Sequence, residues 1–288
     1  MGTPSLTLSI LERTGIRPGT ALFRRVFVFV AYNDVQYTSG LYQQCLGDWA
    51  ARIVVGVPGA DEQVAFIQAC FPLGQHVVFL DDNLDWMKVY RRKQLLALSG
   101  ARGGTCEMQE LIEKAGEAMI KHNANLWGIS QTNNKFYVEK APYMRTGLEL
   151  VYGACFGVRV LHESSLDTRY GQVKDDLERT LRYWHRDKVV LRFSRYAVKK
   201  RKRPGTFGAK AGGISASVGR DGHAREQRQA VRLMVAEFAR PYVRLPRPST
   251  DQMHNASGQL CYLASGEPKW KSHVCSAGVV FKRRRCSP

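Results

Sequence analysis

The chain has 288 residues, of which 44% are hydrophobic, and its formal net charge is +18. This length and composition exclude a disordered chain and allow a sizeable core. Such a charge favours polyanionic partners, namely nucleic acid, nucleotides or an anionic membrane surface. No apolar run reaches about eighteen residues, and the start of the chain lacks a signal-peptide pattern. We therefore expect an intracellular protein without membrane partners, nuclear in a eukaryote and otherwise cytoplasmic.

Cysteine and histidine spacings exclude several classes of site. The 7 cysteines are odd in number and form no C-x-x-C pair, so neither a disulfide framework nor a zinc site is indicated. The histidines lack H-E-x-x-H spacing, and no serine lies in G-x-S-x-G. Metalloprotease and serine-hydrolase functions are therefore unsupported.

The first third of the chain alternates strands with helices. Apolar runs predict strands over residues 26–31, 53–57 and 77–80, and helical patterns cover residues 6–13, 35–46 and 59–70. This alternation predicts βαβ crossovers and a mainly parallel sheet flanked by helices. A doubly wound sheet normally begins with a strand, so we expect that the chain lacks one before its first helix.

Later segments carry weaker or mixed signals. Residues 88–104 are expected to form a mobile basic connector. Helices are predicted over 107–122, 175–185 and 224–240, and strands over 126–130, 136–138, 148–160 and 189–193. Prolines, serines and a basic terminus dominate the end of the chain. We therefore predict one α/β domain over 1–245 and a basic appendage of low order over 246–288.

Acidic residues follow the predicted strand Val77–Leu80 at once. Asp81, Asp82 and Asn83 would lie at the carboxyl end of this strand, where open α/β sheets bind ligands. Carboxylate and amide oxygens suit Mg²⁺ or Mn²⁺ that is also bound by substrate phosphates. A nucleotide diphosphate is then the natural partner, whereas the alternative interpretation is a turn or a helix cap.

A second acidic cluster opens the predicted helix over 175–185. Asp175, Asp176 and Glu178 precede Arg179 and Arg182. A carboxylate in this position can act as general base toward an alcohol. The alternative is helix capping with ion pairs four residues apart.

Two basic regions could bind phosphate. Gly205–Gly219, with Lys210 and Arg220, could surround a diphosphate, but it matches no P-loop or Rossmann pattern, and a mobile loop is the alternative. The second region could contact nucleic acid, or could be a solvated loop or nuclear-import signal. Its cations are Arg192, Arg195, Lys199, Lys200, Arg201, Lys202 and Arg203.

Several stretches, in order, resemble the TET/J-binding-protein-associated glycosyltransferases, the family that includes the base J glucosyltransferase. They are FVFVAYNDVQYTSGLY, ARIVVGVPGADEQVAFI, HVVFLDDNLDWM, NLWGISQTNNKFYV, LVYGACFGVRV, DDLERTLRYWHRDKVVLRF and the GGIS segment. The resemblance covers residues 7–241. It implies a GT-A fold and transfer of a sugar from a nucleotide sugar, in the base J case UDP-glucose onto 5-hydroxymethyluracil in DNA.

The resemblance also implies roles for particular residues. Asp81 and Asn83 match a D-x-D metal and diphosphate motif around Asp82, although Asn83 departs from the usual acid there. Asp176 becomes the expected base, with Asp175 beside it. Arg179, Lys210 and Arg220 become expected donor-phosphate contacts. The family's first strand would precede Thr7, so this chain departs from the family there as well.

We therefore expect an inverting glycosyltransferase that uses Mn²⁺ or Mg²⁺, a UDP-sugar and DNA. One alternative is a glycosyltransferase that acts on protein hydroxyls. The other is a non-catalytic nucleic-acid-binding or scaffold module with the same fold.

Overall fold

The structure is a computed structural model, and it describes most of the first two hundred residues together with short later segments. The described residues are 6–100, 106–130, 134–171, 174–200, Glu226, 229–238, 243–244, 252–254, 260–262, 273–274 and 280–281. The chain divides into two compact units. One is Met1–Asp167 with Arg182–Pro204, and the other is Thr168–Leu181 with Gly205–Pro288.

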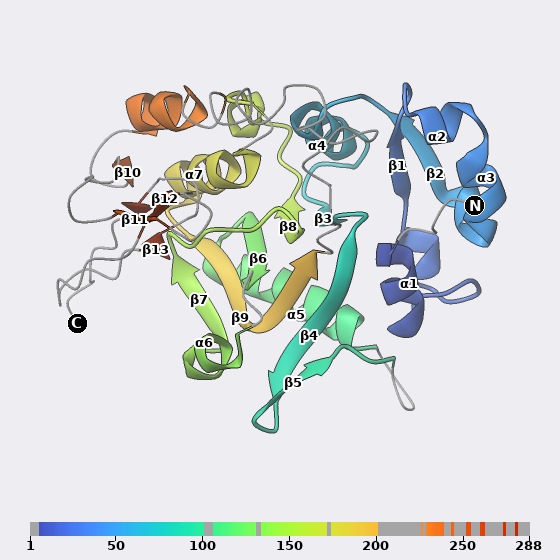
Figure 1. The fold of residues 1–288 in the computed structure, drawn as a ribbon, viewed down its shortest axis with the longest axis horizontal. Helices are drawn as coiled ribbons and strands as arrows, with labels where there is room; N and C mark the ends of the chain where they lie inside the picture. The colour runs from blue at the N-terminus through green and yellow to red at the C-terminus, as the bar shows by residue number, and fades with distance from the viewer. Residues whose placement is uncertain are drawn as a thin grey trace. The chain divides into compact units, whose positions relative to one another are not determined.

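A sheet of seven strands forms the centre of the first unit (Figure 1). The strand order is β3-β8-β6-β9-β4-β5, and β7 also pairs with β9. The strands are β3 (His76–Leu80), β4 (Leu84–Arg91), β5 (Gln94–Ala97), β6 (Leu126–Ser130), β7 (Met144–Gly147), β8 (Cys155–Arg159) and β9 (Val190–Lys200). The strands expected over 77–80 and 126–130 are confirmed, and the strand expected over 189–193 continues to Lys200.

The sheet is mixed, so the prediction of a mainly parallel sheet was wrong. Within it only β6 and β9 pair in parallel, and the other pairings are antiparallel. One reason is that β3 continues into β4 through a turn of three residues, without a crossover helix. Another is the β4–β5 hairpin, which occupies part of the predicted connector 88–104. Its turn residues Arg92 and Lys93 have φ of 49° and 58°, the left-handed conformation that tight hairpins require.

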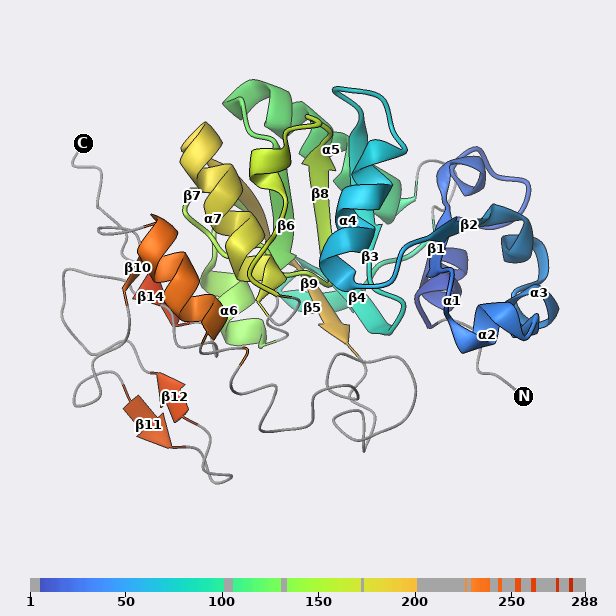
Figure 2. The ribbon, with the colours of Figure 1, turned by 90° about the horizontal axis from the view of Figure 1, so that it is seen from above.

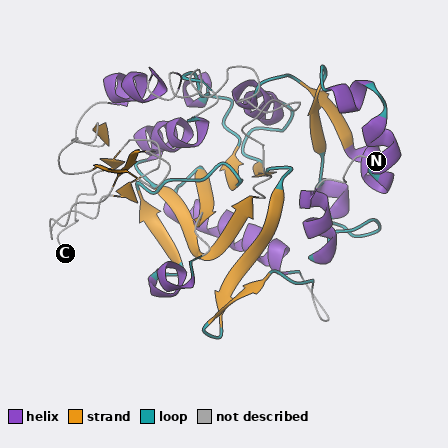
Figure 3. Cartoon of the chain, in the orientation of Figure 1, coloured by secondary structure: helices purple, strands orange, loops and turns teal. Residues whose placement is uncertain are grey.

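The two faces of the sheet bury separate sets of side chains. One set joins α5 (Glu107–His122) and α1 (Leu6–Arg13) to Trp127 and Phe193. The other joins Phe156 and Val158 to Tyr183 of α7 (Asp175–Asp187) and to partly buried residues of α4 (Ala60–Ala69). Figures 2 and 3 show these helices around the strands. The predicted helices over 59–70 and 107–122 are therefore confirmed, together with the α/β class.

Three local predictions need correction. The helix expected over 35–46 is split into α2 (Val35–Thr38) and α3 (Leu41–Cys45) at Gly40, whose φ is 72°. Residues 136–138 lie in a helix, α6 (Lys135–Lys140), because the Asn134 side chain accepts a hydrogen bond from the Phe136 N–H at 3.0 Å and so begins a helical turn. Of residues 148–160, only β8 forms a strand.

Outside the main sheet, strands β1 (Val28–Ala31) and β2 (Ile53–Gly56) form a separate parallel pair. The second unit contains the first turns of α7 (Asp175–Asp187), which confirms the helix predicted over 175–185, and a helical stretch at 229–238. Its short strands are β10 (Val243–Arg244), β11 (Gln252–His254), β12 (Leu260–Tyr262), β13 (His273–Val274) and β14 (Val280–Phe281). No helix in the described part of the chain is long and apolar enough to span a membrane.

Gly157 of β8 lies against a close polar contact between the neighbouring strands β6 and β3. The Trp127 indole Nε1 donates a hydrogen bond to His76 Nε2 at 2.7 Å. A Cβ on Gly157 would lie 2.1 Å from that indole nitrogen and 2.9 Å from the histidine nitrogen. Gly157 therefore allows three neighbouring strands to close around the Trp127–His76 pair.

We expect Gly157→Ala to lower the free energy of unfolding by about 1–3 kcal/mol, because the added methyl group forces the indole and imidazole apart. Urea unfolding measures the change. Gly100→Ala is the matched control, since a Cβ there would meet its nearest neighbours at 3.5 Å, an ordinary contact. Equal stability of the two variants would contradict the close approach at Gly157.

Candidate functional site

The turn between β3 and β4 carries the predicted metal residues and is fixed by the start of α1. The buried Thr7 hydroxyl accepts a hydrogen bond from the Leu84 N–H at 3.2 Å and donates one to the Asp81 carbonyl. The Thr7 N–H donates to the Asp82 carbonyl at 3.4 Å. Thr7 therefore fixes both ends of the turn, and with them the backbone from which the side chains of Asp81, Asp82 and Asn83 extend.

Two side-chain oxygens of this turn are buried. One is Asn83 Oδ1, which has no hydrogen-bond partner among the described residues. The other is Asp81 Oδ2, which contacts the ammonium group of Lys200 at the end of β9. The side chain of Asp82, by contrast, is exposed. The alternating residues of the predicted D-x-D register, Asp81 and Asn83, are therefore the two that each bury a side-chain oxygen, although both side chains are partly exposed.

The geometry partly fits a divalent cation. A carboxylate oxygen and an unpaired amide oxygen are hard ligands, and an ion bound by two such groups relies on substrate phosphates for its remaining ligands. The described residues contain no group of three histidine, cysteine or acidic side chains that could hold a metal alone. Lys200 already neutralises Asp81, so a cation at this carboxylate competes with the ammonium group.

The acidic helix start lies in the second unit. The guanidinium of Arg179, itself buried, pairs with Asp175. The Asp176 carboxylate accepts a hydrogen bond from the Leu177 N–H at 2.8 Å. Burial, and then the charge of Asp175, raise the pKa of Asp176 above its ordinary value. A carboxylate with a raised pKa is a stronger base than an ordinary aspartate, as proton transfer from an alcohol requires.

Glu178 has a structural role that the sequence did not reveal. Its fully buried carboxylate accepts hydrogen bonds from the Arg169 and Tyr170 N–H groups, each at 2.9 Å. A buried carboxylate is stabilised by such donors. Glu178 therefore holds the segment before α7 through these two backbone hydrogen bonds.

The basic segment after Val190 is a strand rather than a loop as far as Lys200. Arg192 Nη2 lies 2.8 Å from the buried Glu149, and Arg195 Nε donates to the Ala141 carbonyl at 2.9 Å. Lys199 Nζ lies 3.2 Å from Asp85. Burial, and then the charge of Arg145, lower the pKa of Arg192 to about 10. Arg201, Lys202, Arg203, Lys210, Arg220 and the glycine-rich loop lie outside the described residues.

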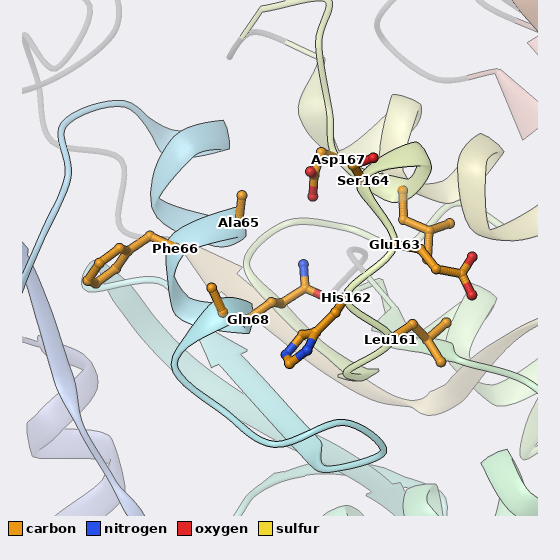
Figure 4. Close-up of a pocket in the computed structure, with 10 residues that line it drawn as sticks. Ala65, Phe66, Gln68, Leu161, His162, Glu163, Ser164 and Asp167 are labelled. Carbon is orange, nitrogen blue, oxygen red and sulfur yellow. The ribbon is translucent and has the colours of Figure 1, made fainter.

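A cavity of about 460 Å³ lies between α4 and the segment that follows β8 (Figure 4). Its lining includes Phe66, Gln68, His162 and Asp167. His162 has a φ of 51°, and its Nε2 lies 2.9 Å from the Phe71 carbonyl. Sequence reasoning missed this cavity because its residues come from distant segments with no motif. The lining mixes apolar side chains with the polar Gln68, His162, Glu163, Ser164 and Asp167.

Comparisons with protein-family models, with curated proteins and with solved structures find no match to this chain.

We expect Lys200→Met to strengthen Mn²⁺ binding by roughly two- to fivefold, since a partly exposed ion pair contributes about 0.5–1 kcal/mol and the competing cation is removed. Asp81→Asn should weaken Mn²⁺ binding. Calorimetric titration with MnCl₂ measures both changes. Lys199→Met serves as the matched control, because it removes the neighbouring ammonium group, which pairs with Asp85 instead. An equal gain in Lys199→Met would show that Lys200 does not compete at Asp81.

Proposed function

We propose that the protein is a glycosyltransferase of GT-A type that moves a sugar, glucose in the first instance, from a UDP-sugar to a hydroxymethylated pyrimidine such as 5-hydroxymethyluracil in DNA. The observation that carries the proposal is the buried, unpartnered Asn83 oxygen beside Asp81 at the carboxyl end of β3. A divalent cation would be the partner of the unpaired Asn83 oxygen, and a nucleotide diphosphate would complete the ligands of that cation.

The bound ion would supply positive charge to the departing diphosphate. Among the chain's own groups, Asp81 and Asn83 would hold that ion through their oxygens, and Lys200 adds a positive charge beside it. Asp176 accepts the proton of the acceptor hydroxyl as the new bond to the anomeric carbon forms and the bond to the UDP oxygen breaks. Displacement from the face opposite the leaving group inverts that carbon.

The net positive charge of the chain supports DNA as the acceptor. A net charge of +18 gives long-range attraction to a polyanion, which weakens steeply with salt. The target base of a duplex must leave the stack before its hydroxyl group can react. Transfer to a protein hydroxyl stays an alternative acceptor chemistry for the same donor site.

A non-catalytic nucleic-acid-binding module is the second candidate, and one specific contact favours it. Lys200 neutralises Asp81 without any metal, so the turn is electrostatically balanced as it stands. This candidate requires that UDP-glucose with Mn²⁺ gives no calorimetric signal and that DNA binding survives Asp81→Asn. A glycosyltransferase, by contrast, must give a calorimetric signal with UDP-glucose and Mn²⁺.

We expect Asp176→Asn to lower transfer to hydroxymethyluracil DNA by about 10²–10⁴-fold, the usual contribution of a general base. In the parent protein, lowering the pH should reduce the rate as Asp176 becomes protonated. Because the pKa of Asp176 is raised, this loss should begin at a higher pH than it would for an ordinary aspartate. Quantifying the glucosylated nucleoside at several pH values tests both points. Glu113→Gln, on the exposed surface of α5, is the control. Full activity of Asp176→Asn would exclude this residue as the base.

A further inference from the structure

The outer face of β4 combines aromatic and cationic side chains at alternate positions. Trp86, Lys88 and Tyr90 are partly exposed, whereas the intervening Met87 and Val89 are buried in the core. Successive side chains of a strand point to opposite faces, so the first three share the outer face. The bulge at Asp85 sets this phase, since the pairing shifts register between Leu84 and Trp86.

The neighbouring strand β9 adds further cations to the same face. Lys199 lies opposite Trp86, and Ala197 lies opposite Lys88, so β9 also directs Arg195, two residues before Ala197, to this side. Ala197 itself is fully buried, so the accessible part of this face is formed by the longer side chains around it. We call Trp86, Lys88, Tyr90, Arg195 and Lys199 the outer basic–aromatic face.

Cations and rings of this face already contact one another. Lys88 Nζ lies 4.5 Å from the centre of the Trp86 ring, and the Arg195 guanidinium carbon lies 5.1 Å from the centre of the Tyr90 ring. The bond from Arg195 Nε to the Ala141 carbonyl fixes the arginine. The rings are thus held on paired strands with positive charge beside each, an arrangement that needs little reordering to receive a planar ligand.

The helix α6 extends the same chemistry beyond the strands. Phe136 and Tyr137 are 55% and 62% exposed, and Lys140 Nζ lies 3.8 Å from the centre of the Phe136 ring. The nearby carboxylate of Glu139 on this helix raises the pKa of Tyr90, so the two surfaces adjoin at this pair. Two acids, Asp85 and Glu139, also lie here, but the cations outnumber them.

We propose that the outer basic–aromatic face binds an unpaired strand of nucleic acid, with bases stacked on Trp86 and Tyr90 and phosphates beside Lys88, Arg195 and Lys199. The positive charge of the face favours a polyanion. The exposed rings favour nucleic acid over an acidic peptide, because its flat bases can stack on them. The proposal deepens the proposed function and rests on it for the DNA acceptor, because a base presented for modification must be unstacked.

The test compares two oligonucleotides of equal length, one of thymidines and one abasic, by fluorescence anisotropy with the full chain and no nucleotide sugar. Trp86→Ala should weaken binding of the thymidine strand by roughly 5- to 100-fold, as loss of one stacked base predicts, and should leave the abasic strand unchanged. Trp86→Phe should restore most of the affinity. Tyr32→Ala, which removes a ring that is 58% exposed elsewhere in the first unit, is the control.

Lys88→Gln and Lys199→Gln should each reduce the slope of log affinity against log salt by about 0.7 on both strands. Thermal unfolding of each variant separates lost binding from lost folding. Equal effects of Trp86→Ala and Tyr32→Ala on the thymidine strand would overturn the proposal, as would an equal loss on the abasic strand in a folded variant. Strand binding without sugar transfer would contradict the glycosyltransferase function alone, and transfer that Trp86→Ala leaves unchanged would contradict the stacking face alone.

Discussion

Strand β9 pairs with three other strands, and the architecture of the first unit depends on these pairings. Its first residues lie between β6 and β7, and its last residues pair with β4. The change of partner coincides with a register irregularity in the pairing of β6 with β9. Ile129 lies opposite Phe193, but the next residue, Ser130, lies opposite Ala197 instead of Ser194. Such irregularities bend a strand and increase its twist. The end of β9 thereby reaches the turn that follows β3.

The bend has an electrostatic consequence at the candidate site. It places the ammonium of Lys200 on the Asp81 carboxylate and leaves the Asn83 oxygen buried without a described partner. A divalent cation bound at this carboxylate would compete with Lys200 for it. In the proposed complex the negative charge of a diphosphate would offset both positive charges.

Buried side chains on β9 fix the register on which both proposed surfaces depend. Tyr196 and Val198 lie in the core, so Arg195 and Lys199 must point outward. A slip of one residue would exchange the two sets and bury the cations. The contact of Lys200 with the β3–β4 turn and the outer basic–aromatic face therefore depend on a single register, which apolar burial sets rather than the charges themselves.

Local periodicity explains which parts of the fold the sequence predicts. The helix over 107–122 and the strand over 126–130 have strong repeating patterns, and both are confirmed. Strand β4 was missed, although Met87 and Val89 alternate with Trp86, Lys88 and Tyr90, because its many charges suggested a connector. Helix α6 was missed because Phe136, Tyr137 and Val138 have strand propensity, which the Asn134 cap overrides.

The direction of strand pairing and the partners of the site residues depend on contacts between distant segments. Nothing near Asp81 in the sequence indicates Lys200, and nothing near Glu178 distinguishes an ion pair from its bonds to the Arg169 and Tyr170 N–H groups. The position of Asp81 and Asn83 after a strand was predictable, because an apolar run before acids marks a strand end. The hydrogen bonds of Thr7 to the backbone of this turn were not predictable, because Thr7 lies more than seventy residues earlier in the chain.

The most direct test of the central claim is mass spectrometry of the nucleosides from hydroxymethyluracil DNA incubated with the protein, UDP-glucose and MnCl₂. The account predicts a nucleoside heavier by one hexose, formed by the parent protein and lost in Asp81→Asn. Unmodified hydroxymethyluridine after incubation with folded protein that binds the DNA would contradict it.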